Sequence, residues 1–342
     1  MSGFEKSKIC VVGAGSWGTT LANLLAGKGM EVDLWVREQD VLNEIRTKGT
    51  NSTFLPGIKL EKNLRAVDTF EEAVFEKKIV LIVVPSHVFR EVLVHIKTFI
   101  KPEMSIMIGT KGIENDTLMI MSQVAESVLS SDWLSKISCL AGPSFAREVC
   151  KKYPTAVTVA CKNGKHAKEL QETLHTDFLR VYISNDLMGC QLGGALKNVI
   201  AIAAGTSDGL KFGHNARAAL ITRGLAEITR LAVAMGSNPY TLAGLAGMGD
   251  LVLTCTGDLS RNRSVGLKIG EGSGIDEITS GMNMVAEGIK TAKSAYELGK
   301  KMGVEMPIAS QVYYMLYEGK NPKEAVKELM SRELKSEIEH EL

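Results

Sequence analysis

The 342-residue sequence lacks an excess of either charge. Its 40 Lys and Arg residues balance 39 Asp and Glu residues, which leaves a net charge of +1, and the two signs are interspersed along the chain. A protein that binds a polynucleotide needs a basic patch or stripe. The charge balance therefore excludes a nucleic acid as the partner.

Long apolar runs are also missing, since no stretch approaches the roughly 20 residues of a membrane span. The first six residues, MSGFEK, are too polar for a secretory signal peptide and lead at once into a strand-like run. We therefore expect a cytoplasmic protein with no membrane span.

Metal-binding spacings are absent as well. The six cysteines contain no CxxC pair, and the six histidines form no HExxH motif and no cluster with cysteine. Structural and catalytic zinc sites usually show such spacings. We expect no metal, and we expect six reduced cysteines that serve as small core residues.

What the sequence does have is a glycine-rich turn between a strand pattern and a helix pattern. GAGSWG, at residues 13–18, follows the apolar run ICVV and precedes TTLANLLA. In dinucleotide-binding folds, Gly13 makes the tight turn, Gly15 lets the backbone touch a pyrophosphate, and Gly18 lets helix pack on strand. Free N–H groups and the positive end of the helix dipole favour phosphate there. The motif predicts a dinucleotide site.

Apolar runs alternate with helical patterns over the first half of the chain. The runs are residues 8–12, 31–36, 79–84, 104–109, 137–141, 156–160 and 179–183. Continuously apolar strands separated by helices are typical of a parallel sheet covered on both faces. We predict an α/β fold with a Rossmann-type, doubly wound parallel sheet over residues 1–184. Ligands bind such sheets beyond the carboxyl ends of the strands.

After residue 184 the strand patterns stop. Segments with a 3.6-residue period follow at 187–205, 216–235 and 286–302, and Gly236 and Gly303 end the last two. Because the chain exceeds the usual single-domain size, we predict a second, all-α domain over residues 185–342. The apolar helix at 216–235 fits either a homodimer surface or the core of the monomer.

Lys197 lies on an unusual helix face. The positions stacked with it carry the smallest side chains, namely Gly193, Gly194, Ala201 and Ala204. Glycine in a helix costs roughly 1 kcal/mol, so such a face indicates a close approach. Either a ligand meets an ammonium group whose lowered pKa suits proton transfer, or helices pack closely and the lysine extends past them to solvent.

Ser260 has the pattern of an N-cap, and Arg261 and Arg263 in the following turn oppose the helix dipole. A phosphate or carboxylate would relieve this conflict, held by free N–H groups, the Ser260 hydroxyl, the Asn262 amide and an arginine. The alternative is an exposed turn with solvated arginines.

Just upstream, GLAGMGD at residues 244–250 predicts a flexible loop that approaches another segment closely. Its carboxylate, Asp250, orients a lysine or a substrate hydroxyl, or merely caps the next segment.

Several segments in order resemble the NAD(P)-dependent sn-glycerol-3-phosphate dehydrogenases, over nearly the whole chain and most closely the soluble bacterial enzymes of phospholipid synthesis. They are GAGSWG at 13–18, IGTKG at 108–112, AGPSFA at 141–146, LKN at 196–198, GMGDL at 247–251 and SRN at 260–262. The resemblance implies a reversible hydride transfer between NAD(P)H and a phosphorylated triose, dihydroxyacetone phosphate.

The resemblance also implies site residues. Lys197 matches the family's proton donor and acceptor, and Lys111 and Asp250 act with it. The implied substrate contacts are Lys111, Gly142, Ser144, Lys197, Asp250, Ser260, Arg261 and Asn262. The implied cofactor contacts are Gly13, Gly15, Ser16, Trp17, Gly18, Arg37, Lys111, Ala146, Arg261, Val285 and Glu287.

The end of the second strand bears on the choice of cofactor. NAD-selective proteins have Asp or Glu there, whereas this chain has Arg37, whose guanidinium suits a 2′-phosphate. Glu38 follows, and a shift of one residue would put a carboxylate in the discriminating place. We expect NADPH to be preferred and NADH to be tolerated.

Two other functions fit the same motifs. A related dehydrogenase of a hydroxyacid or keto acid could bind its carboxylate with the same arginine, and a dinucleotide sensor would need no turnover. The buried lysine disfavours the sensor, because a sensor needs no acid or base.

Overall fold

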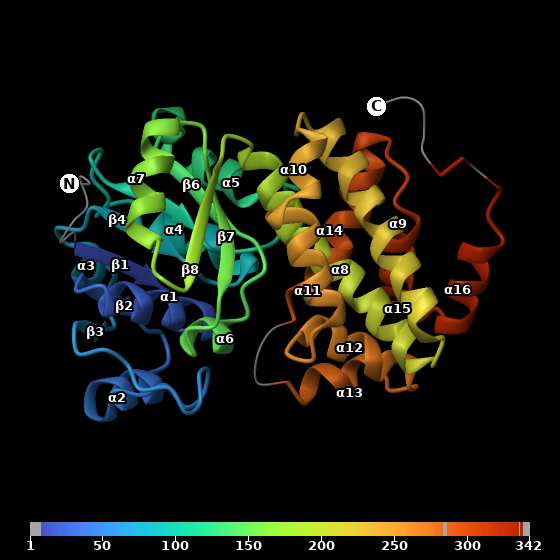
Figure 1. Ribbon diagram of the computed structural model, residues 1–342, viewed down its shortest axis with the longest axis horizontal. Helices are drawn as coiled ribbons and strands as arrows, with labels where there is room; N and C mark the ends of the chain where they lie inside the picture. Colours follow the sequence, from blue (N-terminus) through green and yellow to red (C-terminus); the bar gives the residue numbers. More distant parts are fainter. Residues whose placement is uncertain (1–7, 283–285, 335, 338–342) are drawn as a thin grey trace.

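The computed structural model describes residues 8–282, 286–334 and 336–337. A sheet covered by helices on both faces forms one body, and a group of helices around α8 forms the other (Figure 1). The last strand ends at Ser184 and α8 begins at Leu187. The predicted fold class, a Rossmann-type sheet followed by a helical domain, is confirmed, while the domain limits 1–184 and 185–342 stay a prediction.

One eight-stranded sheet has the order β3-β2-β1-β4-β5-β6-β7-β8. The strands are β1 Lys8–Val12, β2 Glu31–Trp35, β3 Leu64–Val67, β4 Ile79–Ile82, β5 Ser105–Ile108, β6 Ile137–Ala141, β7 Thr155–Cys161 and β8 Leu179–Ser184. The order reverses at β1, so β2 and β4 flank the glycine turn. That reversal is the place where doubly wound sheets bind dinucleotides.

The expectation of a wholly parallel sheet is wrong at one pair, because β7 runs antiparallel to β6. The connection between them contains only α6, Ala146–Cys150, whose five residues span about 7.5 Å at roughly 1.5 Å per residue. A parallel return along a strand needs a longer crossover. The chain therefore turns back directly, and the two last strands extend the sheet in the opposite sense.

Two other details differ from the sequence prediction. The edge strand β3 was not predicted, because it has four residues and one of them is Arg65. The strands at 8–12 and 137–141 have the predicted ends, and the other five differ by one or two residues at one or both ends. For example, β4 stops at Ile82 rather than at residue 84. The chain from 83 to 85 thus forms an irregular segment at the carboxyl edge of the sheet.

The helices that cover the sheet are α1 Ser16–Gly27, α2 Gln39–Lys48, α3 Phe70–Val74, α4 Phe89–Ile96, α5 Met121–Leu129, α6 Ala146–Cys150 and α7 Gly164–Leu174, with short turns η1 Ser86–Val88 and η2 Ser131–Trp133. The helical body comprises α8 Leu187–Gly209, α9 Gly213–Ala234, α10 Pro239–Ala243, η3 Leu245–Gly249, α11 Asp250–Thr256, α12 Arg261–Gly270, α13 Ile275–Ser280, α14 Glu287–Met302, α15 Pro307–Tyr317 and α16 Pro322–Met330.

Helix α8 is the core of the helical body and is buried along nearly all of its length. It meets α12 backbone to backbone, because a Cβ atom on Gly205 would overlap the Arg263 carbonyl, and one on Gly266 would overlap the Ile202 carbonyl. Gly209 and Gly270 continue the same contact. Small residues on both helices therefore set how closely α12 approaches α8.

By length and composition alone, α8 could cross a membrane, which the sequence analysis did not anticipate. However, 94% of its apolar window is buried inside the protein. Such burial is typical of the central helix of a globular domain.

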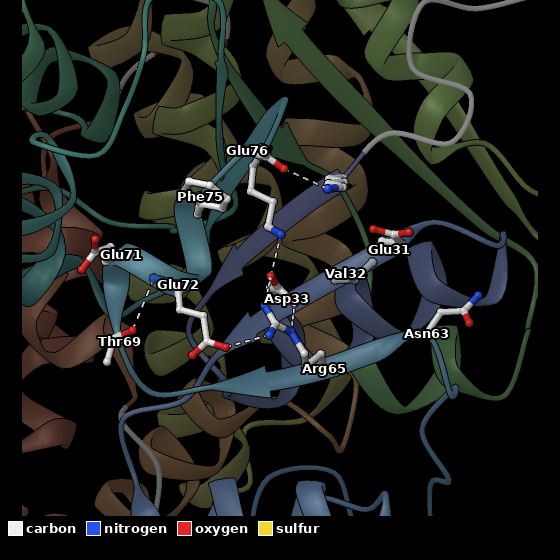
Figure 2. Close-up of a pocket in the computed structure, with 12 residues that line it drawn as sticks. Glu31, Val32, Asp33, Asn63, Arg65, Thr69, Glu71, Glu72, Phe75 and Glu76 are labelled. Atoms are coloured by element: carbon white, nitrogen blue, oxygen red, sulfur yellow. Dashed lines mark hydrogen bonds and ion pairs between the residues drawn. The ribbon is translucent and has the colours of Figure 1, made fainter.

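A cavity of about 640 Å³ lies on the sheet near the first residues of β1 and β2 (Figure 2). Its buried carboxylate, Asp33, is paired with Arg65 at 2.8 Å and with Lys77 at 2.5 Å. Because the glycine turn follows the opposite end of β1, this cavity is not the predicted cofactor site.

All six cysteines are free thiols, and all but the half-buried Cys150 are buried. The expectation of reduced core cysteines is confirmed. Among the described residues, no three His, Cys, Asp or Glu side chains gather as a metal site would require.

Candidate active site

The three glycines of the turn have three different surroundings. Gly13 has φ +114° and packs against the Val83 carbonyl, while a Cβ on Gly18 would overlap the Gly13 carbonyl. These two glycines bring β1, α1 and β4 into direct backbone contact. Gly15 differs, because no atom lies within 4 Å of the place where its Cβ would be. The turn is therefore open to a ligand at Gly15 only.

The next two residues of the turn also have distinct environments. The Ser16 hydroxyl donates to the Phe54 carbonyl at 2.6 Å, so it is engaged within the protein. The indole Nε1 of Trp17 is buried and has no hydrogen-bond partner among the described residues. A buried donor without an acceptor is uncommon in native proteins.

Asp250, the first residue of α11, joins the two bodies through two lysines. Its Oδ1 accepts from Lys197 Nζ of α8 at 2.5 Å, and its Oδ2 accepts from Lys111 Nζ at 2.6 Å. Lys111 follows β5, so one lysine comes from each body. Lys197 also donates to the Thr254 hydroxyl at 2.8 Å, and that hydroxyl donates to the Asp250 backbone carbonyl.

Burial and mutual charge set the ionisation of this group. The pKa of Lys197 is lowered to about 8, chiefly by burial and also by the charge of Lys111, while Asp250 opposes the shift. For Asp250, burial alone raises the pKa, but the two ammonium charges outweigh burial, so the pKa is lowered. Asp250 is therefore a carboxylate near neutral pH, and Lys197 exchanges its proton close to neutrality.

The sequence left two explanations for the small-residue face around Lys197, close helix packing and a lysine placed for chemistry. Each of them is partly correct. A Cβ on Gly193 would overlap the Ala246 carbonyl of η3, and Gly194 faces the aliphatic part of Lys111. Close packing is thus real. The lysine does not extend to solvent, however, because its side chain is only 9% exposed and points to Asp250.

The prediction of a flexible loop at residues 244–250 is wrong. The segment forms a π-helical turn, η3, that continues directly into α11. Gly247 packs on the Leu242 carbonyl, so its backbone contacts fix the turn. The predicted close approach is correct. Asp250 does not cap α11, and it orients two lysines instead of one.

The start of α12 has the predicted cap. The Ser260 hydroxyl accepts from Arg263 N at 3.2 Å. Arg263 itself is neutralised by Asp208 at 2.8 Å and Asp258 at 3.0 Å, so only one of the two arginines opposes the dipole. Arg261 makes no hydrogen bond or ion pair with another described residue and is partly open to solvent. Nearby protein desolvates its guanidinium and lowers its pKa, and Glu287 opposes that shift.

An asparagine pair links α12 to the helix that carries Lys197. Asn262 Nδ2 donates to Asn198 Oδ1 at 2.9 Å, and Asn262 Oδ1 accepts from Gly288 N of α14 at 2.9 Å. The neighbour of Arg261 is therefore bonded to the neighbour of Lys197. The predicted anion site and the lysine site adjoin.

The remaining predicted residues lie around the same edge of the sheet. Glu287 Oε2 accepts from the Ser86 hydroxyl at 2.6 Å, and burial raises the pKa of Glu287. Gly142 and Ser144 follow β6, and the Ser144 hydroxyl donates to the Gly142 carbonyl at 3.0 Å. Ala146 begins α6.

Arg37 and Val285 are the remaining predicted cofactor residues. Arg37 lies two residues beyond β2, is 73% exposed and pairs with Glu38 at 2.7 Å. The two side chains that could recognise the ribose 2′ position, Arg37 and Glu38, are thus paired with each other. Val285 lies outside the described residues.

Sequence reasoning missed Thr254, Asn198 and Ser86. Thr254 stands four residues after Asp250 and hence on the same helix face, which was a usable signal. The pairing of Ser86 with a residue 201 positions away had no such signal.

The glycine turn lies at the sheet reversal, and two lysines share the buried Asp250 carboxylate. Together these features define a nicotinamide-dinucleotide-dependent dehydrogenase with a Rossmann domain and a helical domain. Two family models match the chain. The N-terminal model of NAD-dependent glycerol-3-phosphate dehydrogenase matches residues 8–167, and the C-terminal model matches residues 186–327.

Curated relatives agree. The glycerol-3-phosphate dehydrogenase [NAD(P)+] of Citrifermentans bemidjiense is 57% identical over 330 residues, with 96% of this chain and 98% of the relative covered. That of Syntrophobacter fumaroxidans is 54% identical over 331 residues, with 97% of each covered. The chain belongs to the NAD(P)-dependent glycerol-3-phosphate dehydrogenase family and is therefore an oxidoreductase that uses NAD(P).

Solved structures separate this family from the hydroxyacid alternative. The glycerol-3-phosphate dehydrogenase of Coxiella burnetii superimposes with a TM-score of 0.91 at 42% identity, covering 96% of this chain and 99% of that one. A D-mandelate dehydrogenase gives a TM-score of 0.58 at 15% identity, covering 93% and 99%. The similarity to D-mandelate dehydrogenase therefore shows a shared fold and no more.

Proposed function

We propose that Lys197 is the acid and base in the interconversion of dihydroxyacetone phosphate and sn-glycerol 3-phosphate. The supporting observation is the pair of ion contacts from Lys197 and Lys111 to the buried Asp250 carboxylate. The hydrogen bond between Asn262 and Asn198 links this group to the start of α12, where Arg261 lies. Reduction of a ketone requires a proton for the carbonyl oxygen and a positive charge near it while negative charge develops. A lysine with a pKa of about 8 can give and retake that proton near neutral pH.

The glycine turn fits the cofactor on structural grounds. Space is open at Gly15, the N–H groups of Gly15 and Ser16 have no partner among the described residues, and Trp17 carries an unused buried donor. The N–H groups of Gly15 and Ser16 and the Trp17 indole contact the dinucleotide, while Gly13 and Gly18 shape the turn. Arg37, Lys111, Ala146, Arg261 and Glu287 complete the cofactor site. NAD(P)H supplies the hydride, and this chain's residues orient the ketone and supply the proton.

Lys197 Nζ donates its proton to the carbonyl oxygen during reduction and takes it from the hydroxyl during oxidation. Lys111 places a second ammonium group at the same carboxylate and stabilises the charge that develops on the oxygen. Asp250 fixes both Nζ atoms, and Thr254 holds Lys197 from a second direction. In this arrangement neither lysine needs to reorganise as the reaction proceeds.

The phosphate of the substrate binds at the start of α12. Arg261 offers a guanidinium with no partner of its own, and the backbone N–H groups of Arg261 and Asn262 are free in the described structure. The helix dipole adds to their attraction for an anion. Ser260 and Asn262 shape this end of the helix, and Gly142 and Ser144 contact the substrate from the sheet side.

We also infer the cellular setting. Six free cysteines suit a reducing compartment, so the enzyme acts in the cytoplasm. Its resemblance to the soluble bacterial enzymes supports a role in supplying glycerol 3-phosphate for phospholipid synthesis. A homodimer would form through α9, where Leu220, Ile221 and Leu225 are only partly buried. These three side chains also pack against the core of the helical body.

Replacing Lys197 tests the proton role. Lys197→Ala should leave NAD(P)H binding nearly intact and lower kcat by at least about 10²-fold, the usual effect of losing a general acid. Lys293→Ala, on an exposed position of α14, serves as the control. Near-normal turnover by folded Lys197→Ala would contradict the assignment.

The pH dependence has opposite signs in the two directions. Reduction needs protonated Lys197, so kcat/KM for dihydroxyacetone phosphate should fall as pH rises through about 8, whereas oxidation should rise through the same pH. Removing the carboxylate in Asp250→Asn should move both midpoints to lower pH, because Asp250 favours the charged lysine. Profiles with the same sign in both directions would rule out Lys197 as the titrating group.

Arg261→Ala should weaken substrate binding by roughly 1.5–3 kcal/mol, the contribution of a hydrogen bond to a charged group, and should mainly raise KM. Unphosphorylated dihydroxyacetone should be a poor substrate for the wild type and should be hardly affected by the substitution. Lys268→Ala, on the exposed side of the same helix, is the control. If Arg261→Ala turned over the phosphorylated and the unphosphorylated ketone just as the wild type does, the phosphate site would lie elsewhere.

Cofactor preference depends on Arg37. The wild type should use NADPH better than NADH, and Arg37→Ala should reduce that ratio of kcat/KM values, because the guanidinium suits a 2′-phosphate. Glu38→Gln should increase the ratio by releasing Arg37 from its ion pair. A wild type that favours NADH tenfold, with a ratio unchanged in Arg37→Ala, would show that Arg37 does not read the 2′ position.

A further inference from the structure

The segment between α2 and β3 lies against the glycine turn and is bonded to it by two side chains, Ser16 of the turn and Asn51 of the segment. Asn51 is fully buried, although it stands in a connection and not in a helix or strand. Its Nδ2 donates to the Ala14 carbonyl at 2.9 Å and to the Thr19 hydroxyl at 2.9 Å, and its Oδ1 accepts from Phe54 N at 3.2 Å. Every polar atom of this amide is used.

The Ala14 carbonyl accepts a second hydrogen bond, from the Thr19 hydroxyl at 3.0 Å. Two donors therefore hold this carbonyl toward the protein interior. A peptide unit is planar and trans, so its C=O and its N–H point in opposite directions. The N–H of the same peptide belongs to Gly15, which has no partner among the described residues and borders open space.

We propose that Asn51 is a positioning residue that fixes the Ala14–Gly15 peptide so that the Gly15 N–H points at the cofactor pyrophosphate. This inference rests on the proposed function, because it takes the glycine turn as the dinucleotide site. The position requires an amide. It needs two N–H donors for Ala14 and Thr19 and one acceptor for Phe54, a combination that Asp, Leu and Ser lack.

Asn51→Asp is the sharpest test. It keeps the size of the side chain and the acceptor for Phe54 N but sets a carboxylate oxygen against the Ala14 carbonyl, which should rotate the peptide. We expect the Kd values of NADPH, NADH and ADP-ribose to rise by the same factor, at least about tenfold, because all three contain the pyrophosphate. At saturating cofactor, kcat and the KM for dihydroxyacetone phosphate should stay within about twofold of the wild type.

Two further variants distinguish a positioning role of Asn51 from a general weakening of the contact between this segment and α1. Asn23→Ala removes another tie between the same segment and α1, where Asn23 Oδ1 accepts from Glu61 N at 2.7 Å, but it does not touch the turn. It should leave all three Kd values unchanged. Thr19→Val removes the second donor to Ala14 and should raise the three Kd values by a smaller common factor, so the proposal stays testable if Asn51→Asp does not fold.

The outcomes are distinct. Unchanged binding in Asn51→Asp, an equal loss in Asn23→Ala, or a loss confined to NADPH would each overturn the positioning role and leave the proposed function intact. If Asn51→Asp does not fold, unchanged Kd values in Thr19→Val would overturn it. A wild type that binds no dinucleotide would overturn both.

Discussion

The carboxylate of Asp250 is the contact on which the geometry of the active site depends. Its side chain is 1% exposed, and a buried charge without partners is too costly to keep. Its two partners come from different bodies, Lys111 after β5 and Lys197 on α8. Loss of one partner from a buried ion pair typically costs about 3–5 kcal/mol, because it leaves charge uncompensated. The arrangement of sheet and helices is thus coupled to the ionisation of the groups that carry the chemistry.

Close backbone packing on α8 fixes the positions of Asp250 and Lys197 relative to each other. Glycines on α8 and α12 let the two backbones touch, and the contact brings Asn262 within hydrogen-bonding distance of Asn198. Gly193 of α8 also lets η3 approach closely, and Asp250 follows η3 as the first residue of α11. Proteins transmit displacements through such close-packed contacts because there is no free volume to absorb them. The glycines therefore affect the active site indirectly, because they determine where α12 and η3 lie against α8.

The sequence predicted local features well and long-range ones poorly. The glycine turn, the Ser260 cap and the small-residue face of Lys197 all have signals within one helical turn. The antiparallel β7 depends on a connection too short to recross the sheet, and the edge strand β3 has too few apolar residues to show a pattern. The Asp250 group joins residues 139 and 53 positions apart, which no periodicity reports. For the site residues, the family resemblance supplied the grouping that spacing could not.

Two neutral amides hold backbone segments around this site. Asn51 orients the glycine turn, and Asn262 joins α8, α12 and α14 through both ends of its side chain. A carboxylate in place of Asn262 would sit beside Arg261, partly neutralise the phosphate site, and raise the pKa of the nearby Lys197. An amide supplies both a donor and an acceptor without adding charge. The amides thereby fix the backbone without adding a charge that would change the pKa values of Asp250 and its two lysines or weaken the attraction of Arg261 for phosphate.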